Sequence, residues 1–271
     1  KRKYLIVIVA IAVTFFIATS NSPYSPRIVL ADYFFDKGNN YYSEGDYDLL
    51  KAEKYFKWSL YANPKTPYAH YQLARIYLVQ NELKKAKKEI DVELVNYPDH
   101  KRSFYIRGLI NGYSHNFKEA QEDFEKFIEY SPDEWAGYMD LSWVYINDQK
   151  FQEAIDTAEK GLKKFPDHIW LLSNKGLALY KLGKFEEAKI VLAKDKESAK
   201  NLTSDDWKTA YPGNDPKGAE EGAKEIKAAI SYNLSLVYRN LNETEKYLEE
   251  VEYFQSLFPM GDPRRDKRSE E

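Results

Sequence analysis

The fold is decided by residues 135–168, which read WAGYMDLSWVYINDQKFQEAIDTAEKGLKKFPDH. Apolar side chains recur at helical spacing on either side of a polar turn at 147–150. Small residues at Ser142, Ala154 and Gly161 mark the places where the two helices approach closely. A helix pair this short cannot bury both of its apolar faces alone, so it needs a similar pair on each side.

Copies of this pair recur along the chain at a step of 34 residues. Three sets of positions keep this step: Pro64, Pro98, Pro132 and Pro166; Ala86, Ala120, Ala154 and Ala188; Leu83, Phe117, Phe151 and Phe185. The pattern resembles the tetratricopeptide repeat family, which has an aromatic residue, then Leu-Gly, Tyr, Ala, Phe and a closing Pro. The resemblance covers residues 31–261 and implies a fold and a way of working, without naming a partner.

The resemblance implies an all-α fold, an α-solenoid of about six helix-turn-helix units. The units are expected at residues 31–66, 67–100, 101–134, 135–168, 169–200 and 228–261, with an insertion at 201–225 and a charged tail at 262–271. Unit 3 departs from the family pattern at Arg107 and Asn111, so its first helix is expected to pack loosely. Unit 5 lacks the closing Pro, so its second helix is expected to continue towards Ala199. A helix start is expected near Pro216.

Residues 1–20 form a separate segment, with a basic start followed by the apolar run YLIVIVAIAVTFFIA. One interpretation is a signal anchor that spans a membrane; the other is a signal peptide cleaved near Ala18. A 15-residue helix rises about 22 Å, short of a ~30 Å hydrocarbon core, so an anchor relies on snorkelling and local thinning. We favour the anchor, which places the N-terminus in the cytoplasm and the array outside it, in the periplasm or on the cell surface. Cleavage would make the protein secreted. Residues 21–30 are expected to be a Pro/Ser linker.

Composition excludes several kinds of function. The net charge is -3, with 40 basic and 43 acidic residues well mixed, which gives no concentrated basic face for nucleic acid. The chain has no cysteine, so disulfides and a thiol nucleophile are excluded. No H-E-x-x-H, G-x-S-x-G or Gly-rich phosphate motif is present, and the histidines fit helix starts and packing. We therefore predict no cofactor, no metal site and no enzymatic activity.

The resemblance places partner binding on the inward face of the first helix of each pair. The residues carried over to this face are Phe35, Tyr68, Tyr71, Arg75, Arg102, Tyr105, Tyr113, Met139, Trp143, Trp170, Tyr180, Tyr232 and Arg239. Tyr, Trp and Arg are the types that dominate binding energy at interfaces. Members that clamp a peptide carboxylate use Lys and Asn here, and this chain lacks that Lys. The alternative is that some of these aromatic side chains only pack between neighbouring helices.

These observations predict a membrane-anchored scaffold or adaptor that binds other proteins of a cell-envelope or membrane complex through an aromatic concave groove. The expected partners are extended or helical protein segments in the groove, and the membrane through the N-terminal helix. The alternative is a permanent structural subunit of a large membrane complex or filament. Its uncapped last helix pair would then dock on a neighbour or be covered by the insertion. An enzyme acting on a small ligand is the third hypothesis, and no acid/base pair or nucleophile supports it.

Overall fold

A computed structural model describes residues 25–44, 47–203, 218–258 and 262. Within these ranges every regular element is a helix, as the all-α prediction requires. The residues divide into two compact units, 1–106 and 107–271, and the boundary falls within one helix, α6 (Lys101–Tyr113). The predicted anchor at 1–20 lies outside the described residues. Among the helices that are described, none combines the length and apolar character needed to cross a bilayer.

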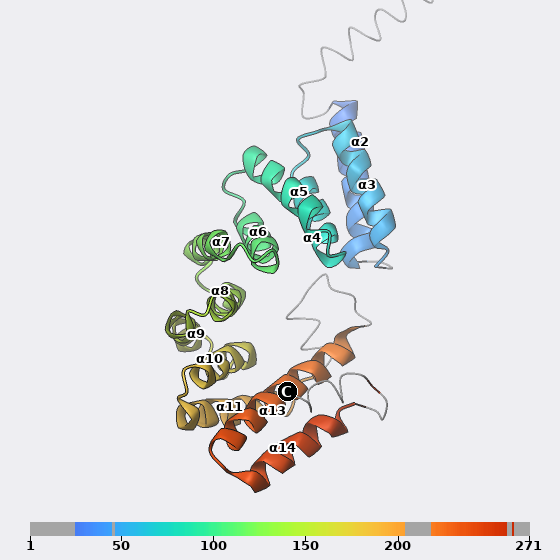
Figure 1. The fold of residues 1–271 in the computed structure, drawn as a ribbon. Helices are drawn as coiled ribbons and strands as arrows, with labels where there is room; N and C mark the ends of the chain where they lie inside the picture. The colour runs from blue at the N-terminus through green and yellow to red at the C-terminus, as the bar shows by residue number, and fades with distance from the viewer. Residues whose placement is uncertain (1–24, 45–46, 204–217, 259–261, 263–271) are drawn as a thin grey trace, which may run out of the picture. The chain divides into compact units, whose positions relative to one another are not determined.

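The first unit is built from two helix pairs (Figure 1). Its elements are α2 (Pro26–Asn39), the π-helix η1 (Asn40–Glu44), α3 (Leu49–Ala62), α4 (Ala69–Val79) and α5 (Leu83–Asn96). Helices α2 and α3 pack side by side, as do α4 and α5, and α3 packs on α4.

The second unit continues the pattern after α6 (Figure 1). Its elements are α7 (Phe117–Tyr130), α8 (Trp135–Asn147), α9 (Phe151–Lys164), α10 (Ile169–Lys181), α11 (Phe185–Ala199), α13 (Ala219–Asn240) and α14 (Thr244–Ser256). Each helix packs on its neighbours in sequence, and α10 also touches α8 and α13. This stacking of pairs is the predicted solenoid arrangement.

The turns inside the pairs α4–α5, α6–α7, α8–α9 and α10–α11 have one repeated backbone geometry. The reversal residue of each turn adopts the left-handed conformation, with φ between 58° and 75°: Asn81, His115, Gln149 and Gly183, again 34 positions apart. The next residue donates its backbone N–H to the carbonyl five positions earlier, as Lys150 does to Tyr145 at 2.9 Å. This is the bond that closes a Schellman motif, and it satisfies carbonyls left open at the end of the first helix.

The repeated prolines mark helix ends. Helices α3, α5, α7 and α9 each end two residues before one of them. Where the proline is missing, α11 runs to Ala199, which confirms the prediction for that helix.

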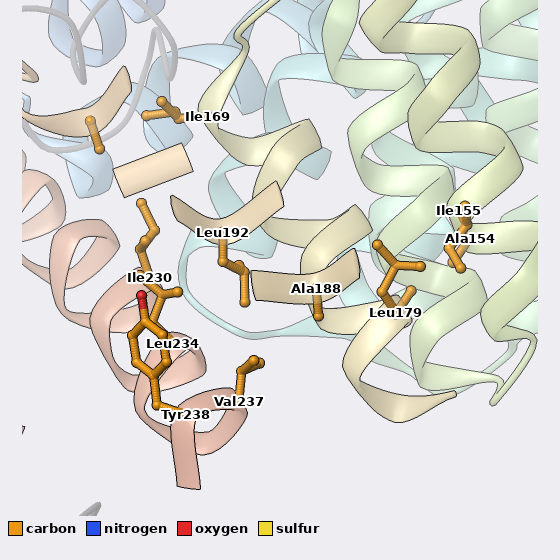
Figure 2. Close-up of a cluster of buried hydrophobic side chains, with 12 residues drawn as sticks. Ala154, Ile155, Ile169, Leu179, Ala188, Leu192, Ile230, Leu234, Val237 and Tyr238 are labelled. Carbon is orange, nitrogen blue, oxygen red and sulfur yellow. The ribbon is translucent and has the colours of Figure 1, made fainter. Parts of the chain in front are cut away.

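The core of the second unit joins helices that are far apart in sequence. Figure 2 shows Leu179, Ala188 and Leu192 of α10 and α11 together with Ile230 and Leu234 of α13. The two helices of the pairs α6–α7 and α10–α11 can approach closely because glycine, which has no side chain, stands at the point of contact. A Cβ added at Gly176 of α10 would lie 2.5 Å from Leu192 of α11, and one at Gly108 would lie 2.9 Å from Phe124.

Two helices begin earlier than the repeat pattern indicates. Helix α2 starts at Pro26, within the segment expected to be a linker, because the Ser25 side chain accepts a bond from the Ile28 backbone N–H at 3.3 Å. Proline at the first helical position costs no bond. Helix α13 starts at Ala219, so the end of the expected insertion is helical, which confirms the helix start expected near Pro216. Both differences lie outside the 34-residue unit, where the period carries no information.

The expectation that α6 packs loosely is wrong. Arg107 donates to both carboxylate oxygens of Asp123 on α7, at 2.7 to 3.1 Å, and Asn111 Nδ2 donates to Asp123 Oδ2 at 2.9 Å. The Asp123 side chain is only 5% exposed. The two residues that depart from the family pattern are therefore partners of one buried carboxylate.

Removing that carboxylate is expected to destabilise the second unit. Asp123→Leu removes the acceptor of the buried Asn111 amide and of the partly buried Arg107 guanidinium, so the free energy of unfolding should fall by about 3 kcal/mol. Arg107→Leu combined with Asp123→Leu should lose less than the sum of the two single changes, because no charge is stranded. Urea unfolding measures both, and Glu122→Gln on the exposed side of α7 is the control. If the losses of the two single variants simply added up in the double variant, the hydrogen-bond network around Asp123 would be contradicted.

A second buried carboxylate, Asp195 of α11, lies fully inside the protein. Its Oδ2 accepts a bond from the Ser173 hydroxyl of α10, and its Oδ1 has no hydrogen-bond partner. Burial raises the pKa of the Asp195 carboxyl to about 8, and the bond from Ser173 lowers it only in part. The neutral acid is therefore the form that suits this site.

The free energy of unfolding should consequently fall as the pH rises through the range in which the Asp195 carboxyl loses its proton. The folded pKa lies above the unfolded value of 3.8, so the folded state holds a proton that the unfolded state releases between about pH 4 and pH 8. Asp195→Asn keeps the side chain neutral, so it should be more stable than the parent at pH 8 by at least ~1 kcal/mol, with the gain vanishing near pH 4. Urea unfolding at both pH values tests this, with Glu197→Gln on exposed α11 surface as control. Identical pH slopes for parent and variant would refute it.

Candidate interaction surface

Two predicted residues of the first unit, Tyr71 and Arg75, belong to a small polar and aromatic cluster on α2, η1 and α4. Arg75 donates to Gln72 Oε1 at 2.8 Å, and Gln72 Nε2 donates to Asn39 Oδ1 at 2.7 Å. The Arg75 guanidinium also lies 4.6 Å from the ring centroid of Tyr42 and 5.6 Å from that of Tyr71. Arg75 is thereby held in place on this face. Gln72 also belongs to this cluster. It is not among the residues predicted from the sequence, because amide side chains follow no recognisable pattern in the repeat.

The start of α4, which carries Tyr68 and Tyr71, is fixed by a residue of α5. Glu93 is fully buried, and its two oxygens accept the backbone N–H groups of Tyr68 at 3.1 Å and Tyr71 at 3.3 Å. Helix α4 has no capping bond from its own N-cap side chain, so Glu93 serves instead. Burial raises the pKa of Glu93, and the two backbone bonds oppose that rise.

His100 completes this cluster. Its ring lies 4.7 Å from that of Tyr68 and 4.9 Å from that of Tyr71, both edge-on. Its Nδ1 is 2.8 Å from Ser103 Oγ and 3.6 Å from Glu93 Oε1. Burial, and then the nearby Arg102, lower the pKa of His100, so the ring is neutral near pH 7. His100 precedes α6 directly, which agrees with the prediction that it belongs to a helix start.

In the second unit, Tyr113 and Trp143 come together from α6 and α8. Their ring centroids are 5.3 Å apart, and Trp143 also covers Gly112, where a Cβ would meet it at 2.9 Å. Tyr113 remains 53% exposed. One ring of the pair is thus packed while the other is presented to solvent.

A further aromatic cluster joins α8 and α10. The Trp135 and Trp170 rings stack with centroids 5.4 Å apart and an interplanar angle of 13°, and the His168 ring lies 4.4 Å from Trp135. Burial lowers the pKa of His168 to about 4, so the ring is uncharged at neutral pH. His168 is the N-cap residue of α10. Trp135, absent from the predicted set, is found only once α8 and α10 are placed side by side.

Met139 lies deeper than the other predicted residues. It is 8% exposed and packs with Tyr138 and Leu171. Its carbonyl and the Ser142 hydroxyl accept bonds from Asn174 Nδ2 at 2.9 and 2.8 Å, which ties α10 to α8.

The remaining predicted residues are divided between packing and exposure. Tyr180 packs on Phe185 and Tyr232 on Phe254, and both are half-buried. Phe35 packs on Phe56, with ring centroids 5.5 Å apart. Arg102 and Arg239 are exposed, and Tyr105 is half-buried. Together, the first helices carry aromatic side chains that are held by neighbours yet partly accessible, which suits the binding of a polypeptide. Within the described residues, no group of three or more His, Asp or Glu side chains is placed to hold a metal ion.

Stacked helix pairs of this kind define an α-helical repeat protein. Residues 35–101 and 107–169 match the tetratricopeptide repeat family model. This match and the fold together support the tetratricopeptide repeat family.

Three solved structures share the fold. PilW, a type IV pilus biogenesis factor, superposes with a TM-score of 0.69 at 15% identity, over 87% of this chain and 96% of its own. MamA from Desulfovibrio magneticus RS-1 gives 0.59 at 18% identity, over 64% and 97%. YrrB, described as a TPR protein with an unusual peptide-binding site, gives 0.51 at 18% identity, over 76% and 93%. A comparison with curated proteins found no match.

The cap on α4 can be tested directly. Glu93→Gln replaces one acceptor oxygen with a donor that faces a backbone N–H, so the free energy of unfolding should fall by about 1–3 kcal/mol. Hydrogen exchange at the Tyr68 and Tyr71 amides should become faster. Asp91→Asn, on the same helix and paired with Lys87 in an exposed ion pair, is the control and should change stability by under ~1 kcal/mol. Unchanged exchange at both amides would show that Glu93 is not the cap.

Proposed function

We propose that this protein is a membrane-anchored scaffold that binds segments of other envelope or membrane proteins on the first-helix face of its repeats. The observation that carries the proposal is the partial exposure of aromatic side chains on that face. Tyr68 is 49% exposed and Tyr113 is 53% exposed, although each contacts other rings. Such side chains offer large contact area and lose little conformational freedom on binding.

The membrane part of the proposal is supported by sequence alone. Residues 1–20 combine a basic start with an apolar run, and basic residues favour the cytoplasmic side. The repeats would then lie outside the cytoplasm, close to the bilayer. The absence of a catalytic motif, and the non-enzymatic character of the scaffold class, favour binding over catalysis.

A permanent structural subunit is the second candidate, favoured by the outer side of the last pair. Helix α14 is held to α11 by ion pairs, Lys196 to Glu250 at 2.7 Å and Lys189 to Glu243 at 2.8 Å. Its other side exposes Leu248, which is 58% accessible. An adaptor should be recovered alone from solubilised membranes, whereas a subunit should be recovered only with its complex.

The binding face is tested with two matched tyrosines. Tyr113 ends α6, on the proposed face, and Tyr130 ends α7, a second helix, with 41% exposure. We expect Tyr113→Ala to reduce recovery of crosslinked partner from native membranes roughly tenfold or more. The same variant should shift the melting temperature by less than about 4 °C, since the side chain is half exposed.

Tyr130→Ala should leave partner recovery unchanged. Equal losses of partner recovery for the two variants would show that the partner does not bind at the proposed face. A loss of recovery that only follows a loss of melting temperature would make Tyr113 a packing residue.

A further inference from the structure

The first helix pair has a second aromatic face, directed away from the next pair. Helices α2 and α3 pack side by side (Figure 1), and their contacts with α4 run through Asn39 and Glu53, which bond Gln72 and Tyr77. The opposite side, which we name the outer flank, carries Leu30, Tyr33, Phe34, Lys37, Lys51, Lys54, Tyr55 and Trp58. No repeat precedes this pair among the described residues.

The outer flank is aromatic and accessible. Leu30 is 47% exposed, Tyr33 54% and Trp58 40%. The rings contact one another: Phe34 lies 5.7 Å from Tyr33 and 5.4 Å from Trp58, measured between centroids. They form one continuous apolar surface with polar tips, unlike the scattered single apolar residues that are normal on a protein surface.

The charge on the outer flank is positive. Lys54 Nζ lies over the Trp58 ring, 4.7 Å from its centroid, and Lys37 Nζ lies over the Tyr33 ring, 5.8 Å from its centroid. The carboxylates of α2 lie elsewhere. Asp32 and Asp36 share the helical face of Asn39, towards α4, because they are spaced three to seven residues from it.

The two carboxylates at α3, Asp48 and Glu53, are engaged with other residues. Asp48, at the start of α3, is paired with Lys51 at 3.0 Å, and Glu53 is bonded to Tyr77 at 2.9 Å. Rings with polar edges, flanked by lysines, are the composition found where proteins meet the headgroup layer of a bilayer. An excess of lysine further selects anionic headgroups.

The chain brings the outer flank to the bilayer. If residues 4–18 are inserted, as in the proposed function, only residues 19–25 separate them from α2. Seven residues span at most about 25 Å. Ser25 caps α2 and Pro26 fixes its first turn, so the helix starts at once without a long spacer.

We propose that the outer flank lies in the headgroup layer of an anionic membrane, with its rings among the headgroups and its lysines on lipid phosphates. The proposal rests on the membrane anchor of the proposed function. It makes the first helix pair a second membrane contact, which orients the repeats relative to the bilayer.

The test uses the absence of cysteine in this chain. Leu30→Cys and Leu248→Cys each give one labelling site, on the outer flank and on α14, with parent exposures of 47% and 58%. The full-length variants, carrying an environment-sensitive fluorophore, are reconstituted into nanodiscs of phosphatidylcholine with one quarter phosphatidylglycerol. Brominated phospholipid is the quencher. We expect quenching at position 30 to be at least threefold stronger than at position 248.

A charge-reversed variant separates the outer flank from the anchor. Lys37→Glu with Lys54→Glu should reduce quenching at position 30 at least twofold, while the protein still floats with vesicles. Equal quenching at positions 30 and 248 in a protein that floats would overturn the outer-flank proposal and leave the anchor intact. A protein that does not float would overturn both. Protection of position 30 without lipid, increasing with protein concentration, would show that a second copy covers the outer flank and would also overturn it.

Discussion

Close approach of the two helices within a pair is the constraint on which this structure depends. It is met at one repeated position, where the first helix has no room for a larger side chain and the second contributes the residue sixteen places on. Gly108 faces Phe124, and Gly176 faces Leu192, with less than 3 Å available for an added Cβ. The corresponding Ser142 and Ala158 are both fully buried. Varied residue pairs thus keep the helices at a similar separation.

The regularity of this contact explains why so much of the fold could be predicted from the sequence. The period located the turns, the helix ends at the prolines and the run of α11 to Ala199. It failed where a residue's role is set by a partner elsewhere. Arg107 and Asn111 look like defects in a repeat, but become consistent once Asp123 is placed beside them. Such compensating contacts link two positions within one helix pair, so aligning one repeat with another does not reveal them.

The sequence pattern predicted which residue types lie on the first helices, but not what surrounds each of them. The pattern indicated which residues lie on the first helices, yet it did not separate Met139, which is 8% exposed, from Tyr113, which is 53% exposed. The supporting residues were also missed, because Glu93, Gln72 and Trp135 acquire their roles from a neighbouring helix. Many aromatic side chains on these helices are partly packed and partly exposed. A residue's position in the repeat therefore does not determine how much of its side chain is accessible.

The left-handed turns have a consequence for how surface chemistry varies along each unit. Asparagine, histidine, glutamine and glycine all occupy the same backbone geometry at Asn81, His115, Gln149 and Gly183, and all four are exposed. The reversal is held by backbone bonds, so it does not depend on which side chain the residue carries. These turns can therefore differ in charge and hydrogen-bonding capacity from one hairpin to the next while the backbone reversal stays the same.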